Sequence, residues 1–142
     1  MIDTPLTRRA LKLARAAHQG QVDKAGVPYL HHPCRLAEGM PDEITTCVAL
    51  LHDVLEDTPV TLAQLERDFP PEVTQAVARL TRPAGMDYFA YVASLKNHPI
   101  ARLVKQADLA HNSDEGRLAA LPPEERARLR EKYARAKAIL ED

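Results

Sequence analysis

The chain has 142 residues, of which 45% are hydrophobic and 27% are charged, and its formal net charge is −1. These values predict a soluble globular protein with a buried core, organised as one domain over residues 1–142. The balanced charge argues against a general nucleic-acid binder, which is usually basic. No apolar run reaches the roughly 18 residues of a membrane span, and the N-terminus lacks a signal-peptide pattern, so we expect a cytoplasmic protein without membrane or nucleic-acid partners.

Helix signals recur along the chain, and no stretch shows the alternation of a strand. Thr4 is expected to cap a first helix over residues 5–18, and a loop rich in glycine and proline follows it. Later helices are expected over about 31–39, between Asp42 and Thr58, and over about 61–68, 71–81, 87–96, 99–112 and from 122 almost to the end. The aromatic residues of 87–96 are expected in the core. The sequence therefore predicts an all-α domain, a single bundle of about seven or eight helices.

The most informative stretch is residues 50–57, where four polar residues interrupt an apolar helix. Positions four apart share a helix face, so His52 is expected above Glu56, and Asp53 above Asp57. An unpaired carboxylate against apolar surface is costly to desolvate. A bound cation satisfies both His and Asp, and this pair suits a divalent transition ion such as Mn, Fe or Zn.

Two other stretches add polar groups at apolar positions. The apolar stripe of residues 99–112 continues into Asp108 and His111, and Asn112 lies beside Asp108 because it follows four residues later. An acid in that position needs a cation or several hydrogen-bond donors nearby. The candidate site residues from three stretches are His32, His52, Asp53 and Asp108. The alternative interpretation is that these are separate buried polar groups, each satisfied on its own.

The H…HD…D pattern resembles that of the HD phosphohydrolase superfamily, an all-helical fold that binds a divalent metal. Four segments further resemble the hydrolase domain of Rel/SpoT-type alarmone enzymes and the small stand-alone alarmone hydrolases: residues 18–21, 26–33, 49–58 and 105–112. The Glu-Asp pair that follows His-Asp after two residues is the narrow signature of this branch.

The resemblance implies four metal ligands, with Mn²⁺ as the expected ion: His32, His52, Asp53 and Asp108. It also implies that Glu56 and Asp57 handle the attacking water and proton transfers. Lys24 and Asn112 are expected to contact a small-molecule nucleotide. The reaction implied is removal of the 3′-pyrophosphate from guanosine tetraphosphate or pentaphosphate, here ppGpp and pppGpp.

The chain departs from the family pattern at Asp23 and Leu109, where the family usually has arginine. Both changes remove a positive charge, and arginine is the natural partner of a highly anionic nucleotide. One alternative is therefore an HD phosphatase acting on another nucleotide or a phosphomonoester, and another is a metal- and nucleotide-binding module with little turnover. Glu56 and Asp57 could instead be surface charges near a helix end. The helical surface could also pair copies into a homo-oligomer.

Overall fold

A computed structural model describes residues 1–141, and the secondary structure in that range is helical apart from turns, loops and one isolated bridge between Val22 and Pro28. The helical segments of this range are α1 (Pro5–Ala17), α2 (His31–Glu38), α3 (Glu43–Leu51), α4 (Val54–Asp57), α5 (Leu62–Asp68), α6 (Pro71–Arg79), α7 (Tyr88–Ser94), α8 (Pro99–Asn112), α9 (Glu115–Leu118) and α10 (Pro123–Glu141). The predicted all-α class is confirmed. The count exceeds eight because α4 and α9 are single turns of four residues.

Polar caps fix the starts of several helices. The Thr4 and Thr7 side chains each bond the backbone N–H of the other, which forms a capping box at the start of α1. Asp42 accepts the Thr45 N–H at 2.8 Å at the start of α3, and Thr61 caps α5. These bonds satisfy N–H groups that a helix leaves unpaired at its first turn. The starts of α1, α3 and α5 could therefore be predicted from the sequence.

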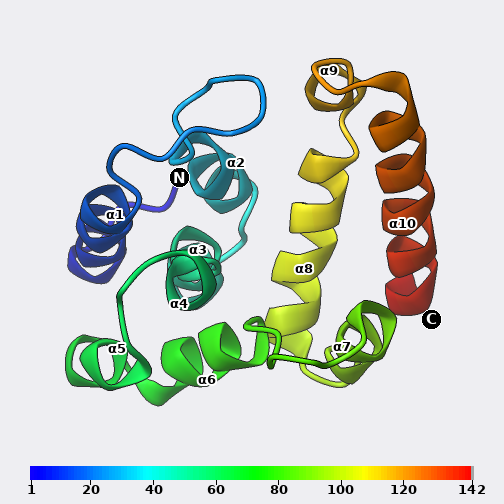
Figure 1. The fold of residues 1–142 in the computed structure, drawn as a ribbon. Helices are drawn as coiled ribbons and strands as arrows, with labels where there is room; N and C mark the ends of the chain where they lie inside the picture. Colours follow the sequence, from blue (N-terminus) through cyan, green and yellow to red (C-terminus); the bar gives the residue numbers. More distant parts are fainter. Residues whose placement is uncertain (142) are drawn as a thin grey trace.

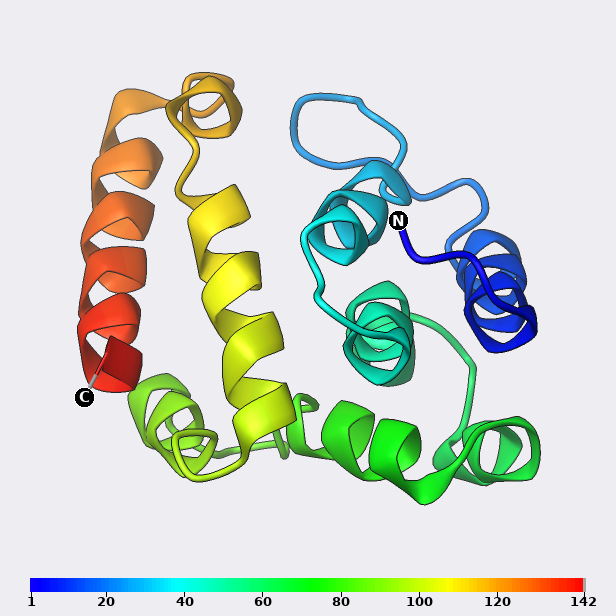
Figure 2. The same ribbon diagram turned by 180° about the vertical axis from the view of Figure 1, so that it is seen from behind.

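Helix α3 lies at the centre of the fold, between α1 and α2 on one side and α6 and α8 on the other (Figure 1). Both views show α10 running alongside α8, with α7 at one end of the pair (Figures 1 and 2). The loop before α2 lies on the same side of the molecule as α9 (Figure 2). This arrangement places the end of α3, the start of α2 and the middle of α8 next to one another.

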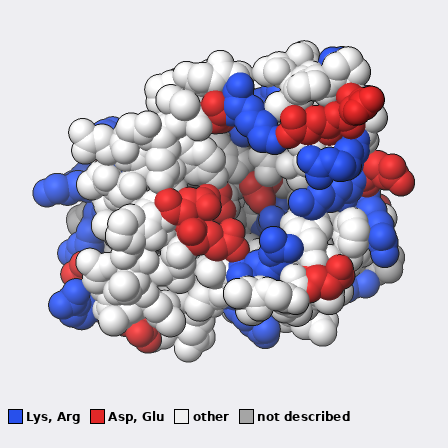
Figure 3. Space-filling view, viewed as in Figure 1, with Lys and Arg blue, Asp and Glu red and all other residues white. Residues whose placement is uncertain are grey.

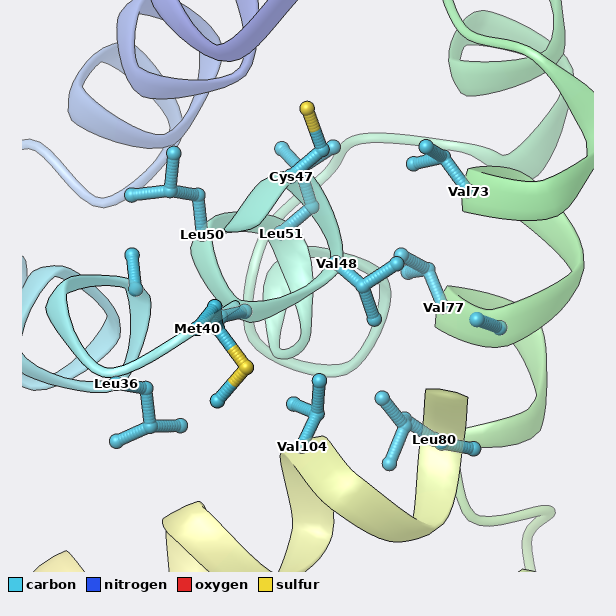
Figure 4. Close-up of a cluster of buried hydrophobic side chains, with 14 of the residues drawn as sticks. Leu36, Met40, Cys47, Val48, Leu50, Leu51, Val73, Val77, Leu80 and Val104 are labelled. Atoms are coloured by element: carbon cyan, nitrogen blue, oxygen red, sulfur yellow. The ribbon is translucent and has the colours of Figure 1, made fainter. Parts of the chain in front are cut away.

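The core explains why α3 is central. Its residues 45–51 are all buried, and side chains from α2, α6 and α8 converge on them (Figure 4). Leu50, Leu51 and Val48 are fully buried, and each such side chain contributes about 1.5–3 kcal/mol through burial. In the described part of the chain, no helix is both long and apolar enough to cross a membrane.

The expected central helix is not continuous, which corrects the sequence prediction. It ends at Leu51, and His52 and Asp53 form a turn before α4 begins at Val54. The His52 Nδ1–H donates to Ala49 O at 2.7 Å, the carbonyl that Asp53 N–H would bond in an unbroken helix. Asp53 then takes φ −107° and ψ 0°, outside the ordinary helical range. The break therefore occurs at the two residues that carry the site.

Candidate metal centre

The four predicted ligands come together from three elements. One donor atom from each of His32, His52 and Asp53 lies within 4.8 Å of the other two. The Asp108 carboxylate joins them from α8, with Oδ1 2.8 Å from His32 Nε2 and 3.6 Å from His52 Nε2. Both imidazoles and Asp108 are buried, and Asp53 is half-buried. Residues 76 apart in the chain are therefore in direct contact.

The environment of His52 favours a positive charge. Because Nδ1–H is committed to Ala49 O, the Nε2 atom of a neutral ring carries a lone pair. Within residues 1–141 that Nε2 is buried without a hydrogen-bond partner, and it lies 3.0 Å from Asp53 Oδ2. Burial lowers the pKa of His52, but the Asp53 and Asp108 carboxylates outweigh it and raise this pKa well above its ordinary value. A metal ion satisfies the same lone pair and the same carboxylates, so the donor set fits one.

Both carboxylates are held in their ionised form. Burial raises the pKa of Asp53, but the charged His52 ring and the Tyr29 hydroxyl, which donates to Asp53 Oδ2, bring it down to about 2. Burial likewise opposes ionisation of Asp108, but the Lys105 ammonium at 2.9 Å holds its pKa well below the ordinary range. Ionised carboxylates are the form that binds a metal ion.

His111, which is not among the predicted ligands, orients His32. The Nδ1 atoms of His32 and His111 are 2.7 Å apart, and the two rings stack with centroids 4.9 Å apart. Burial and the nearby Arg117 lower the pKa of His111 to about 4, so its ring is neutral at pH 7. Its Nδ1 can then accept a hydrogen bond from His32 Nδ1–H. His32 then presents Nε2 to the cluster. The sequence placed His111 on the same stripe as Asp108 but assigned it no role.

Glu56 and Asp57 are exposed on α4, at the edge of the cluster. Glu56 lines a cavity with His52 and Asp53, and its Oε1 accepts the backbone N–H of Arg82 at 2.5 Å. Partial burial, followed by the negative charges of Asp53 and Glu56, raises the pKa of Asp57. Acidic atoms gather on the α4 side of a hollow face, opposite basic atoms on the α8–α10 side (Figure 3). This position suits proton exchange with a group bound in the hollow.

Lys24 and Asn112, the residues predicted to contact a nucleotide, line one cavity of about 300 Å³. Asn112 also donates to Asp108 Oδ1 at 3.1 Å, which links this cavity to the donor cluster. Arg117 of α9 lines the same cavity and lies 3.7 Å from the Asp23 carboxylate. Arg117 therefore offsets the negative charge of Asp23 but does not replace the positive charge of the family's arginine.

A second cavity of about 130 Å³ lies against the cluster, and its basic residues were not identified from the sequence. They are Arg82, Lys105 and Lys132. Lys105 had a local signal, since it precedes Asp108 by three residues on the same helix. Arg82 and Lys132 come from distant segments, and no local pattern marks them.

Tyr88 is half-buried, packs against the core and also lines this second cavity, so its expected place in the core is confirmed in part, whereas the half-buried Phe89 is not part of the core cluster. Tyr91, Val92 and Leu95, from the same group, are buried as predicted. Tyr88 begins α7 at the wall of this cavity, and periodicity alone does not separate a core edge from a cavity wall.

Together the fold and the donor cluster define an all-helical protein with a buried His/Asp centre suited to a divalent cation. The family profile described as "HD domain" matches residues 10–112. The chain belongs to this family, which confirms the resemblance found in the motifs.

The relatives that match are longer proteins. The bifunctional (p)ppGpp synthase/hydrolase SpoT of Escherichia coli K12 is 34% identical over 137 residues, covering 86% of this chain and 19% of SpoT. A guanosine-3′,5′-bis(diphosphate) 3′-pyrophosphohydrolase of Haemophilus influenzae is 33% identical over 132 residues, covering 82% of this chain and 19% of that protein. The chain thus spans about a fifth of the length of these relatives.

One solved structure matches almost end to end. It belongs to a metazoan ortholog of SpoT that is described as hydrolysing ppGpp and playing a role in starvation responses. The TM-score is 0.76 at 22% identity, and the match covers 99% of this chain and 94% of that one. This similarity establishes the fold.

Proposed function

We propose that this chain is a metal-dependent nucleotide pyrophosphohydrolase that removes the 3′-pyrophosphate of ppGpp or pppGpp. The observation that carries the proposal is the buried Nε2 of His52, which faces two ionised carboxylates and has no hydrogen-bond partner in the described residues. The relatives named as 3′-pyrophosphohydrolases support the substrate. The alternatives are a phosphatase acting on another substrate and a binding module with little turnover, and a turnover assay distinguishes them.

The residues proposed to hold the ion are His32, His52, Asp53 and Asp108, and Mn²⁺ is the proposed ion. A divalent ion supplies Lewis acidity there, which polarises phosphoryl oxygens and makes water more acidic. The hydrogen bond from His52 Nδ1 to Ala49 O fixes the ring, as is usual for a metal-binding histidine.

The proposed reaction is a hydrolysis in which a water oxygen bonds to the phosphorus attached to the 3′ oxygen. The bond between that phosphorus and the 3′ oxygen breaks, a proton goes to the 3′ oxygen, and pyrophosphate leaves. Glu56 and Asp57 are the proposed proton carriers, because both lie at the edge of the cluster and the pKa of Asp57 is raised. A positioned carboxylate of this kind typically accelerates proton transfer by about 10²–10⁴-fold.

The nucleoside is proposed to occupy the larger cavity. At about 300 Å³ it is at the lower end of the range for small-ligand pockets. Lys24 and Arg117 line it, each paired with a carboxylate, of Glu125 and Asp23 respectively. Tyr29 and Leu118 provide flat or apolar surface. Asn112 also lines this cavity, and its side-chain amide donates a hydrogen bond to Asp108.

The test is turnover of ppGpp by the purified chain with Mn²⁺, run beside a panel of other nucleotides and phosphomonoesters. We expect release of pyrophosphate from ppGpp and a drop of about 10²-fold or more in kcat for Glu56→Gln, with metal content unchanged. Activity on a monophosphate without activity on ppGpp would identify the phosphatase alternative. Tight ppGpp binding with no hydrolysis by the wild-type chain would identify the binding module.

The cytoplasmic location expected from the sequence stays a prediction, and so does pairing of two copies into a homo-oligomer.

A further inference from the structure

Three cations surround one aromatic ring in the lining of the smaller cavity. Lys132 Nζ lies 4.1 Å from the centre of the Tyr88 ring, Lys105 Nζ 5.6 Å from it, and Arg82 Cζ 5.8 Å from it. They come from α10, from α8 and from the segment between α6 and α7. These residues, Arg82, Lys105 and Lys132, are called the basic corner. Contact with the ring lowers the cost of holding cations there but does not neutralise their charge.

The basic corner carries more positive charge than its surroundings balance. Lys105 pairs with Asp108, whereas in residues 1–141 neither Arg82 nor Lys132 has a carboxylate within ion-pair distance of its side chain. Glu56 reaches Arg82 only at the backbone N–H. Burial, followed by the charges of Arg82 and other cations, lowers the pKa of Lys132. An anion bound in the corner would relieve this repulsion.

The cavity in front of the basic corner has the size of a substituent rather than of a nucleotide. Its volume of about 130 Å³ is well below the range of about 300–1,000 Å³ that holds a whole small ligand. His52, Asp53 and Asp108 also line it. A group in this cavity therefore has both the donor cluster and the cations within reach.

The donor cluster lies between the two cavities. The larger cavity reaches it through Tyr29, which bonds Asp53, and through Asn112, which bonds Asp108. The smaller cavity reaches it directly. A ligand that spans the site has its nucleoside at one end, its reacting phosphorus at the cluster and a further anionic group at the other end.

We propose that the basic corner binds the distal phosphate of the cleaved diphosphate group and thereby selects a diphosphate over a monophosphate ester. This inference rests on the proposed function, because it takes the proximal phosphorus to be at the donor cluster. Lysine and arginine form short, charge-assisted bonds with phosphate oxygens, and the guanidinium can do so with two N–H groups. When the 3′ oxygen separates from the proximal phosphorus, the leaving pyrophosphate stays in contact with these cations until it is released. A monophosphate ester has nothing to place there.

The test is calorimetric binding of inorganic pyrophosphate and of inorganic phosphate to the Mn²⁺-loaded protein, at one fixed Mn²⁺ concentration for all variants. We expect Arg82→Gln and Lys132→Gln each to weaken pyrophosphate binding by about tenfold or more, the loss typical of one charge-assisted bond, and to change phosphate binding by less than about threefold. Lys137→Gln, on α10 but outside both cavities, is the matched control and should bind pyrophosphate like the wild type. Lys132→Arg keeps the charge and should restore binding, which separates loss of a contact from misfolding.

Equal pyrophosphate affinity in the wild type, Arg82→Gln and Lys132→Gln overturns the inference. Guanosine 5′-diphosphate, the product of ppGpp hydrolysis, distinguishes the cleaved group from the 5′ group. If its affinity falls in the variants as much as that of pyrophosphate, the corner binds the 5′ group and the inference is wrong. If the wild type hydrolyses ppGpp but the variants bind pyrophosphate as tightly as the wild type, this inference is wrong and the proposed function stands. If the variants weaken pyrophosphate binding but the protein does not hydrolyse ppGpp, the basic corner binds pyrophosphate and the proposed function is wrong.

Discussion

Tyr29 donates a hydrogen bond from its hydroxyl to Asp53 Oδ2, although the two residues are 24 apart in the chain. The Tyr29 ring also lies against His18 and His32, with centroids 4.9 Å and 5.8 Å away. The loop before α2 is thereby attached to the carboxylate of the turn after α3. This contact fixes the orientation of one predicted metal ligand from outside the ligand set.

Removal of the Tyr29 hydroxyl should therefore weaken metal binding without unfolding the protein. Partners of this kind typically contribute about 10–100-fold in metal affinity, and we expect about tenfold for Tyr29→Phe. A competition titration with a metal-binding dye measures the change. Tyr133→Phe is the control. Tyr133 lines the larger cavity together with Tyr29 but, in the described residues, is not a hydrogen-bond partner of the predicted ligands. Similar metal affinity in both variants would contradict the proposed role.

The sequence was sufficient for most of the fold because the signals there are local. Thr4, Asp42 and Thr61 cap the helices where the pattern placed them, and the apolar stripes face the core except at Leu103 of α8, which is exposed. Asp108 was also recognisable, because an acid on an apolar stripe requires a partner. The break at His52 and Asp53 could not be recognised in the sequence, because apolar periodicity continues across it. In the structure, the His52 side chain bonds Ala49 O where the helix ends.

The rest of the site depends on contacts between distant segments. Arg82, Tyr88 and Lys132 share a cavity only after α6, α7 and α10 have packed around α8. Each of them has an ordinary explanation in its own segment as a surface charge or a helix-start aromatic. Arg117 is a similar case, since its position next to Asp23 is visible only in the fold. Local spacing carries no information about such pairs.

The pairing of Asp108 with Lys105 makes a prediction about stability. Lys105 is nearly buried, with a side chain only 13% exposed, so Asp108→Asn leaves its charge without a compensating carboxylate. Breaking one side of a buried pair costs about 3–5 kcal/mol, and we expect a loss of that size in the free energy of unfolding. Urea denaturation in the presence of a chelator measures it free of any metal effect.

The second substitution Lys105→Met should recover part of that loss, because it removes the stranded charge. Asp3→Asn is the comparison at the surface, since the Asp3–Arg8 pair is exposed and should change stability by less than about 1 kcal/mol. If Asp108→Asn were no more destabilising than Asp3→Asn, the buried pair would contribute no more to stability than an exposed one.

The Asp42 cap makes a prediction about pH. Hydrogen bonds from the Thr45 N–H and hydroxyl lower the pKa of Asp42 in the folded chain. A lowered pKa means that the ionised form is favoured by folding, so its stabilisation is complete above the unfolded pKa of about 3.9 and is lost as the pH falls through the folded value. Asp42→Ala should therefore cost about 1 kcal/mol at pH 7 and less at acid pH.

Urea titrations of the wild type and of Asp42→Ala between pH 2 and pH 7 measure this difference on a scale of about 1 kcal/mol. Glu66→Gln, an exposed acid on α5, serves as the control for the general charge effect. A gap between wild type and Asp42→Ala that is constant across this pH range would show that the carboxylate charge has no part in the cap.

Metal binding should also stabilise the fold, because the proposed ligands come from α2, from the turn after α3 and from α8. An ion present at 100 times its dissociation constant adds about 2.7 kcal/mol, which corresponds to a rise in Tm of about 5–10 °C for a chain of this size. Thermal unfolding with Mn²⁺ and with chelator measures this shift. Asp108→Ala should abolish the Mn²⁺-dependent rise, whereas Glu56→Gln should keep it, because Glu56 is a proposed proton carrier and not a ligand. A rise of equal size in Asp108→Ala would mean that Mn²⁺ stabilises the protein from another site, and the proposed ligand set would then be wrong.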